Sequence, residues 1–87
     1  MFKKFINSIE NAIKNCDEII VAVETKDLGG MHLCIVPDMV SEDSGLIMIL
    51  TGKSTIVFET KLNMLDYNEE ENEYVIFGDH GVTTIKF

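Results

Sequence analysis

The sequence contains no arginine and no tryptophan, and it has a single proline. All seven basic residues are lysines, so the chain lacks the guanidinium group that binds phosphates through paired hydrogen bonds. Fifteen acidic residues outweigh these lysines and give a formal net charge of −8. Since this charge opposes contact with DNA, RNA or anionic lipid, we expect neither a nucleic-acid partner nor a membrane partner.

Long apolar runs and clustered cysteines are also missing. No apolar run exceeds five residues, which is far too short to span a bilayer. Lysines near the N-terminus resemble those of a secretory leader, but polar residues interrupt the positions that follow, so we expect no signal peptide. Cys16 and Cys34, the only cysteines, lie at a predicted helix end and inside a predicted strand. We expect free, buried thiols in a cytoplasmic protein.

Apolar residues are sufficient for one folded domain. They make up 46% of the 87 positions, and eleven of them are isoleucine. A chain of this length is too short to build two cores, so residues 1–87 are predicted to form a single domain.

An amphipathic helix is predicted over Phe2–Asn15. Its apolar residues recur every three or four positions, which places them on one face of a helix. They are Phe2, Phe5, Ile6, Ile9, Ala12, Ile13 and Cys16. Because several strand-like segments follow, we expect this face to cover a sheet and not to lie on a membrane.

After the helix, the apolar residues alternate with a period of two, which predicts strands. Strands over residues 18–25 and 31–36 are separated by a turn at residues 28–30, and Pro37 ends the second strand. Residues 38–45 are polar and are predicted to form a connection. The later strands are predicted as one hairpin at residues 46–51 and 55–60 and a closing hairpin at residues 74–77 and 82–87.

Two connecting segments remain, at residues 52–53 and 61–67. Gly52 and Lys53 suit a two-residue loop, and a glycine in the first position favours a type II′ turn with positive φ. Residues 61–67 fit either a short helical turn or a continued strand. The pattern as a whole predicts an α+β fold, in which one N-terminal amphipathic helix packs on an antiparallel sheet of about five to six strands.

Two short motifs resemble known binding loops, and neither is complete. Residues 52–55 match the end of a phosphate-binding loop, but Ile47 stands where its first glycine is required. Residues 66–70 match the start of a calcium loop, but Glu71 and Phe77 replace its glycine and its closing glutamate. We therefore expect no catalytic residues and no cofactor, in a protein that is not an enzyme.

A metal- or ligand-binding site remains as an alternative. His32 and Cys34 are two positions apart on one predicted strand and therefore project from the same face. His80 lies in the last predicted turn, from which it could approach them. Imidazole and thiolate are zinc ligands, and a site needs at least three protein ligands, so this alternative uses His32, Cys34 and His80 together.

Acidic residues are concentrated in the second half of the chain. Residues 38–87 carry ten acidic residues and three lysines, a formal charge of −7, whereas residues 1–37 carry a charge of −1. The candidate partner-binding residues are Asp66, Tyr67, Glu69, Glu70, Glu71, Glu73 and Tyr74, with Glu42 and Asp43 on another loop. Tyrosine is favoured at interfaces. Three apolar residues, Met39, Val40 and Met64, are expected to extend the contact.

In size, acidity and absence of motifs, the chain is similar to small phage-encoded inhibitors of host defence, the anti-CRISPR proteins among them. This likeness is one of composition and gives no residue a role. It implies an inhibitor that binds a protein with a basic surface and occupies its nucleic-acid-binding site, because Lys and Arg bind carboxylates as well as phosphates. Alternatively, the charge only solvates the protein, or the chain is a structural, self-assembling module, such as a homodimer joined through a sheet edge or a helix face.

Overall fold

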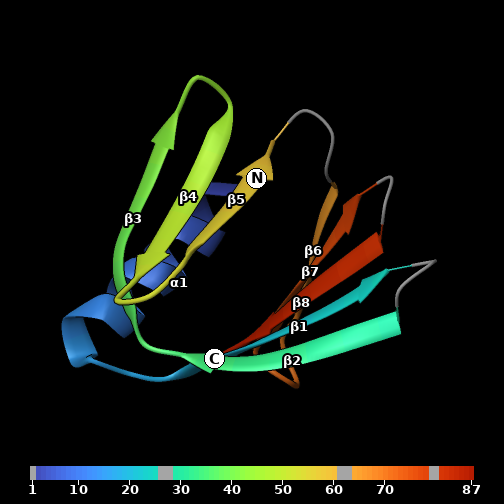
Figure 1. Cartoon of the computed structure of the whole chain (residues 1–87), viewed down its shortest axis with the longest axis horizontal. Coiled ribbons are helices and arrows are strands. Elements are labelled where there is room, and N and C mark those ends of the chain that lie inside the picture. The colour runs from blue at the N-terminus through green and yellow to red at the C-terminus, as the bar shows by residue number, and fades with distance from the viewer. Residues whose placement is uncertain (1, 26–28, 61–63, 79–80) are drawn as a thin grey trace.

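A computed structural model describes residues 2–25, 29–60, 64–78 and 81–87. Within these ranges there are one helix, α1 (Phe2–Asn15), and eight strands that follow it (Figure 1). The strands are β1 (Ile19–Thr25), β2 (Gly29–Ile35), β3 (Pro37–Asp43), β4 (Leu46–Thr51), β5 (Thr55–Glu59), β6 (Met64–Asn68), β7 (Glu73–Gly78) and β8 (Gly81–Lys86). All strand pairs are antiparallel, so the predicted α+β class is confirmed.

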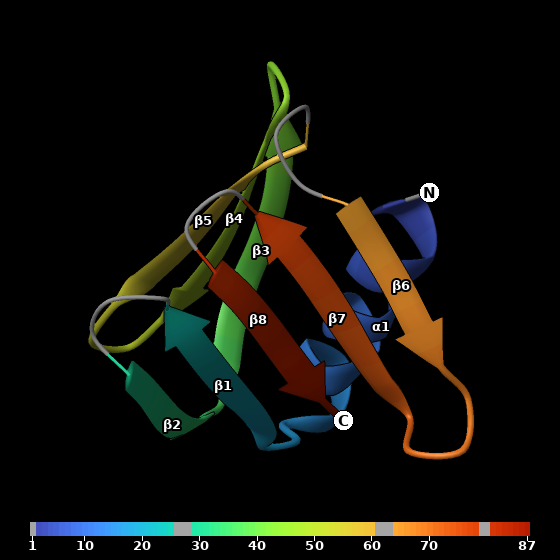
Figure 2. The same ribbon diagram turned by 90° about the vertical axis from the view of Figure 1, so that its right-hand side faces the viewer.

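The strands form two sheets, where the sequence predicted one. A large sheet has the strand order β2-β1-β8-β7-β6, and a small sheet has the order β3-β4-β5. The chain crosses from one sheet to the other between β2 and β3, at the bottom of Figure 1, and the two sheets diverge from there. Helix α1 packs beside β3 and lies behind the β7 and β6 side of the large sheet (Figure 2).

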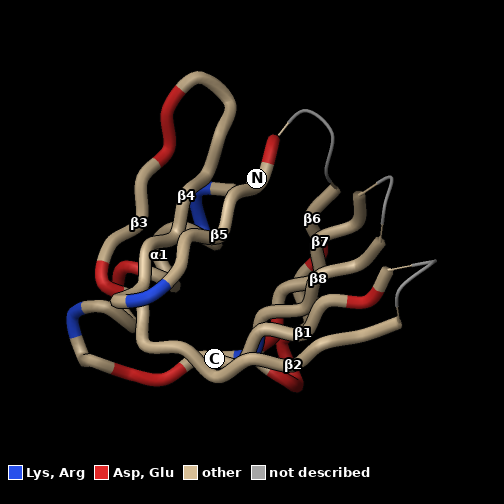
Figure 3. Tube along the Cα trace, in the orientation of Figure 1, with Lys and Arg blue, Asp and Glu red and all other residues tan. Residues whose placement is uncertain are grey.

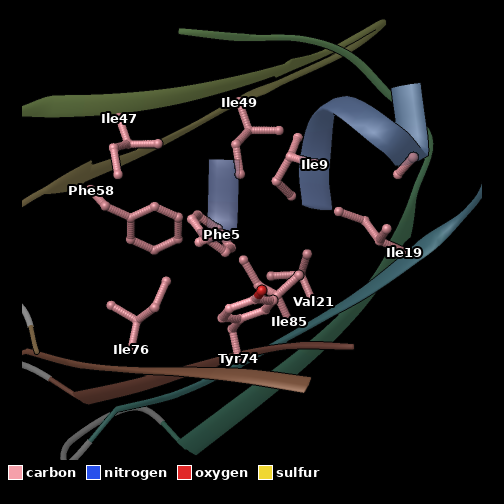
Figure 4. Close-up of a cluster of buried hydrophobic side chains, with 11 residues drawn as sticks. Phe5, Ile9, Ile19, Val21, Ile47, Ile49, Phe58, Tyr74, Ile76 and Ile85 are labelled. Carbon is pink, nitrogen blue, oxygen red and sulfur yellow. The ribbon is translucent and has the colours of Figure 1, made fainter. Parts of the chain in front are cut away.

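The core lies between the large sheet and the layer formed by α1 and the small sheet. Eleven apolar or aromatic residues are buried there, and no polar or charged residue is buried in the described part of the chain. They are Phe5, Ile9, Ala12, Ile19, Val21, Ile47, Ile49, Phe58, Tyr74, Ile76 and Ile85 (Figure 4). The helix contributes one face and the strands contribute alternate residues, as the two periodicities predict.

Helix α1 ends in a Schellman motif. The backbone N–H of Asp17 donates to the carbonyl of Ala12 at 2.9 Å, and that of Cys16 donates to the carbonyl of Ile13 at 3.2 Å. Cys16 takes the left-handed position with φ = 56°, where glycine is usual. Both Cys16 and Cys34 are free and exposed, so the expectation that these thiols are buried was wrong.

The polar segment 38–45, predicted as a connection, contains most of β3. Pro37 is tolerated because it is the first residue of an edge strand. Ser44 and Gly45 have φ values of 52° and 80°, and this pair of left-handed residues forms the tight type I′ turn into β4. The strand was missed because polar residues dominate it, while its inward positions still pack against the core and α1.

The other predicted strands are present, with changes at their ends. Gly29 and Gly30, predicted as part of a turn, belong to β2, and residue 28 lies outside the described residues. Gly52 does not have the positive φ of a type II′ turn. Instead, the Thr51 hydroxyl accepts hydrogen bonds from the N–H groups of Lys53 and Ser54 at 3.3 and 3.1 Å. Such a hydroxyl-capped turn also closes a hairpin.

In the ambiguous segment 61–67, the residues from Met64 onward belong to strand β6, which agrees with the strand alternative. Residues 61–63 lie outside the described residues. The closing hairpin is β7 and β8, whose last paired residues are Gly78 and Gly81. No helix in the described residues is long and apolar enough to cross a membrane.

Replacing Cys16 with glycine tests the strain at the helix end. We expect the free energy of unfolding to rise by about 0.5–1 kcal/mol. Glycine relieves about 1–2 kcal/mol of strain in the left-handed conformation, and this gain exceeds the loss of about 0.4–1 kcal/mol that arises because glycine makes the unfolded chain more flexible. Urea denaturation measures this change. Cys16→Ala is the control, since it removes the thiol but keeps Cβ, and an equal gain in both variants would contradict the backbone explanation.

Candidate protein-interaction surface

The densest acidic stretch forms the turn between β6 and β7, residues 69–72, which we call the acidic turn. The Asn68 side-chain oxygen accepts hydrogen bonds from the N–H groups of Glu70 and Glu71 at 3.1 and 3.4 Å. Asn72 closes the turn with φ = 51°, and its N–H donates to the Glu69 carbonyl at 3.3 Å. Asparagine suits both positions because it caps backbone groups and tolerates left-handed φ. The acidic turn therefore has a defined backbone.

Hydrogen bonds and ring contacts tie this turn to the rest of the fold. The Tyr67 hydroxyl donates to Asn72 Oδ1 at 3.0 Å, and the Phe87 N–H donates to the Asn72 carbonyl at 3.1 Å. The Tyr67 ring lies 4.5 Å from the Tyr74 ring, centroid to centroid. On helix α1, Lys4 Nζ lies 4.1 Å from the Tyr67 centroid, a cation–π distance. The turn is thus held against both the sheet and the helix.

The acidic turn displays its carboxylates to solvent. Glu69, Glu70 and Glu71 are all exposed. Glu71 Oε2 accepts a hydrogen bond from Lys86 Nζ at 3.1 Å, but both side chains are about half exposed, at 56% and 46%, so this pair contributes little stability. Asp66 and Glu73 lie on the strands that flank the turn. These five carboxylates outnumber the two lysines described near the turn, Lys86 and Lys4, so the surface is negative.

Two further carboxylates, which the sequence did not indicate, lie near this turn. Asp17 and Glu18 follow α1 and line a cleft of about 350 Å³ together with Asn72 of the acidic turn. The other lining residues are Ser8, Asn11, Ala12, Ile19 and Phe87. The C-terminal end of α1, the negative end of the helix dipole, also lies here, and Lys14 in the last helical turn offsets part of its charge. We call Asp17, Glu18, Glu69, Glu70 and Glu71 the acidic end of the molecule.

Glu42 and Asp43 are not part of the acidic end. They lie near the tip of the β3–β4 hairpin, which is at the top of Figures 1 and 2, whereas the acidic turn is at the bottom of both views. Figure 3 shows the same separation in the acidic segments of the chain trace. Glu42 instead lines a hollow with Phe2 and Lys3 of α1. The predicted contact set is therefore divided between two ends of the molecule.

Tyr74 is a core residue, and its predicted role as a surface anchor was wrong. Its side chain is 1% exposed, and its hydroxyl lies 2.9 Å from Ser8 Oγ and donates to the Lys4 carbonyl at 3.3 Å. Tyr67 is half-buried beneath Lys4 and remains a candidate contact residue.

The apolar residues expected to extend the contact do not surround the acidic turn. Met39 and Met64 are exposed on different sheets, and Val40 faces the core. The sequence pattern had no information on which strands share a sheet.

The structure describes two of the three residues of the metal-site alternative. His32 and Cys34 are exposed on one face of β2, as predicted, and His80 lies outside the described residues. Within the described ranges, no group of three His, Cys, Asp or Glu side chains could hold a metal ion.

Replacing Tyr74 with phenylalanine tests its structural role. We expect the free energy of unfolding to fall by about 1 kcal/mol, the usual net value of one hydrogen bond. The loss is small because Ser8 Oγ also donates to the Lys4 carbonyl at 3.1 Å, so neither partner is left unpaired. Urea denaturation measures this change. A loss of about 3 kcal/mol or more, the size expected for deleting a whole aromatic ring, would contradict this assignment.

Comparison of the chain with protein-family models, curated proteins and solved structures gives no match.

Proposed function

We propose that this chain is a non-catalytic binding protein whose acidic end docks on a basic surface of another protein. The observation that carries this proposal is that a turn with a defined backbone holds three exposed glutamates beside the cleft of Asp17 and Glu18. The partner is a protein that handles nucleic acid. Binding inhibits it, because the carboxylates occupy lysine and arginine side chains that otherwise contact phosphates.

The fixed backbone of the acidic turn favours binding. Ordering a flexible loop on association costs free energy, and a loop that is ordered in advance avoids this cost. Here Asn68 and Asn72 fix the turn, and Tyr67 connects it to the sheet. The backbone that carries the carboxylates is therefore ordered before a partner arrives.

The negative electrostatic field of the acidic end also favours binding to a positively charged surface. Asp17 and Glu18 add to the glutamates of the turn, and only Glu71 among these five residues has a lysine in a described ion pair. A concentrated negative patch accelerates association with a positive one and gives the complex a strong salt dependence.

Reversing two charges at the acidic end tests the proposal. The double variant Glu69→Lys/Glu70→Lys keeps the Glu71–Lys86 pair. We expect its affinity for a partner captured with the wild-type chain to fall at least about tenfold and to depend less on salt concentration. The matched control is Glu42→Lys/Asp43→Lys, which makes the same charge change at the opposite end. The partner is isolated by affinity capture with the wild-type chain, and each affinity is then measured by calorimetry at several salt concentrations.

Two outcomes would contradict the proposal. Unchanged affinity in Glu69→Lys/Glu70→Lys would exclude the acidic end as the contact surface. Equal losses in both double variants would show that only the net charge matters. Competition gives a separate test of the inhibitory role: a single-stranded oligonucleotide should displace the chain from its partner, and failure to do so would exclude a shared site.

A further inference from the structure

The two open sheets have four edge strands, which are β2 and β6 in the large sheet and β3 and β5 in the small sheet. An exposed edge presents unpaired backbone N–H and C=O groups to any other extended strand. Folded proteins usually protect such edges with charges, proline, bulges or very short strands.

Three of the four edges carry such protection. Strand β3 begins with Pro37, has a register shift between Pro37 and Met39, and contains three carboxylates. Strand β5 has five residues and ends in Glu59, and β6 also has five residues and contains Asp66. Each of these edges therefore resists the addition of another strand.

Strand β2 has none of these features. Its seven residues, Gly29–Ile35, include no lysine, carboxylate or proline, and all seven pair with β1 without a register shift. Six of the seven are exposed, and Met31 and Leu33 are 53% and 40% exposed. Figure 2 shows β2 at the free left edge of the large sheet, where no described segment pairs with its outer side.

We propose that β2 pairs antiparallel with β2 of a second copy of this chain, with the two His32 residues opposite each other. This register uses all seven residues of both strands and joins the two large sheets into one continuous sheet. Met31 and Leu33 lie symmetrically about His32 and on the same sheet face, so Met31 of each copy lies opposite Leu33 of the other. The two most exposed apolar side chains of the edge thereby cover each other.

Among the four edges, β2 is the one at which charge least opposes a second copy. Two chains of net charge −8 repel each other, and they can approach most closely where the surface carries no carboxylate. Strand β2 is such a surface, and the nearest described carboxylate in its ladder, Glu24, lies opposite Gly30 on β1. The acidic turn follows β6, at the opposite edge of the large sheet, and therefore stays away from the pairing strand.

Solution mass measurements test the dimer. Sedimentation equilibrium of the wild-type chain should give twice the monomer mass, and Leu33→Lys should weaken dimerisation at least about tenfold, because each dimer loses two apolar cross-strand pairs and gains two buried charges. Val57→Lys is the matched control, since Val57 is 50% exposed on the protected edge β5, and it should leave the dimer intact. Circular dichroism checks that both variants are folded.

Cross-linking tests the register. In a Cys16→Ser/Cys34→Ser background, His32→Cys should form an intermolecular disulfide under mild oxidation, because opposed antiparallel residues have Cα atoms about 4.5–5.5 Å apart, within disulfide range. Val57→Cys in the same background reports random collision and should cross-link slowly. Equal rates in the two variants would overturn the proposed register.

A wild-type chain that stays monomeric at high concentration would overturn the proposal, as would a dimer that Leu33→Lys leaves unchanged. Salt separates this inference from the proposed function. Added salt should strengthen the dimer by screening repulsion between copies, whereas it should weaken the complex with a basic partner. Either proposal can therefore fail without the other.

Discussion

The contact of Phe5 with both sheets is the constraint on which the rest of the structure depends. Its ring lies 5.2 Å from Tyr74 of the large sheet and 6.3 Å from Phe58 of the small sheet, in edge-to-face arrangements. The side chain is completely buried, and Figure 4 shows it among the other core side chains. Because the sheets diverge, the helix must fill the space between them, and Phe5 does so. The same contact sets the position of Tyr74, on which Tyr67 and the acidic turn rest.

Much of the fold could be predicted from periodicity, and the division into two sheets could not. Apolar residues at helical spacing located α1, and alternation located most strands, because burial of one face imposes both patterns. Strand β3 was missed because Asp38, Glu42 and Asp43 give it the composition of a loop. Its strand character depends on pairing with β4, and pairing is a tertiary property.

The acidic end was also predicted only in part, because some of its residues are brought together by tertiary structure. Glu69, Glu70 and Glu71 are adjacent in sequence, so their clustering needed no knowledge of the fold. Asp17 and Glu18 join them only because β1 lies beside β8 and β8 beside β7, which brings the end of α1 near the acidic turn. Tyr74 was assigned to the contact surface because it flanks the acidic stretch and tyrosine is favoured at interfaces. In the structure the Tyr74 hydroxyl forms hydrogen bonds with the Ser8 hydroxyl and the Lys4 backbone carbonyl, and these bonds allow the ring to be buried.

The acidic turn and the pairing strand β2 lie at opposite edges of one sheet, and this separation lets both proposed surfaces operate. Four strand spacings of about 4.8 Å place β6 about 19 Å from β2, which is twice the screening length of about 8–10 Å at ordinary salt concentrations. In the paired arrangement, nine spacings place the two β6 strands about 43 Å apart. Repulsion between the two acidic turns is then negligible. The carboxylates of the acidic turn therefore add little to the repulsion between paired copies, because they are far from the edge at which the copies meet.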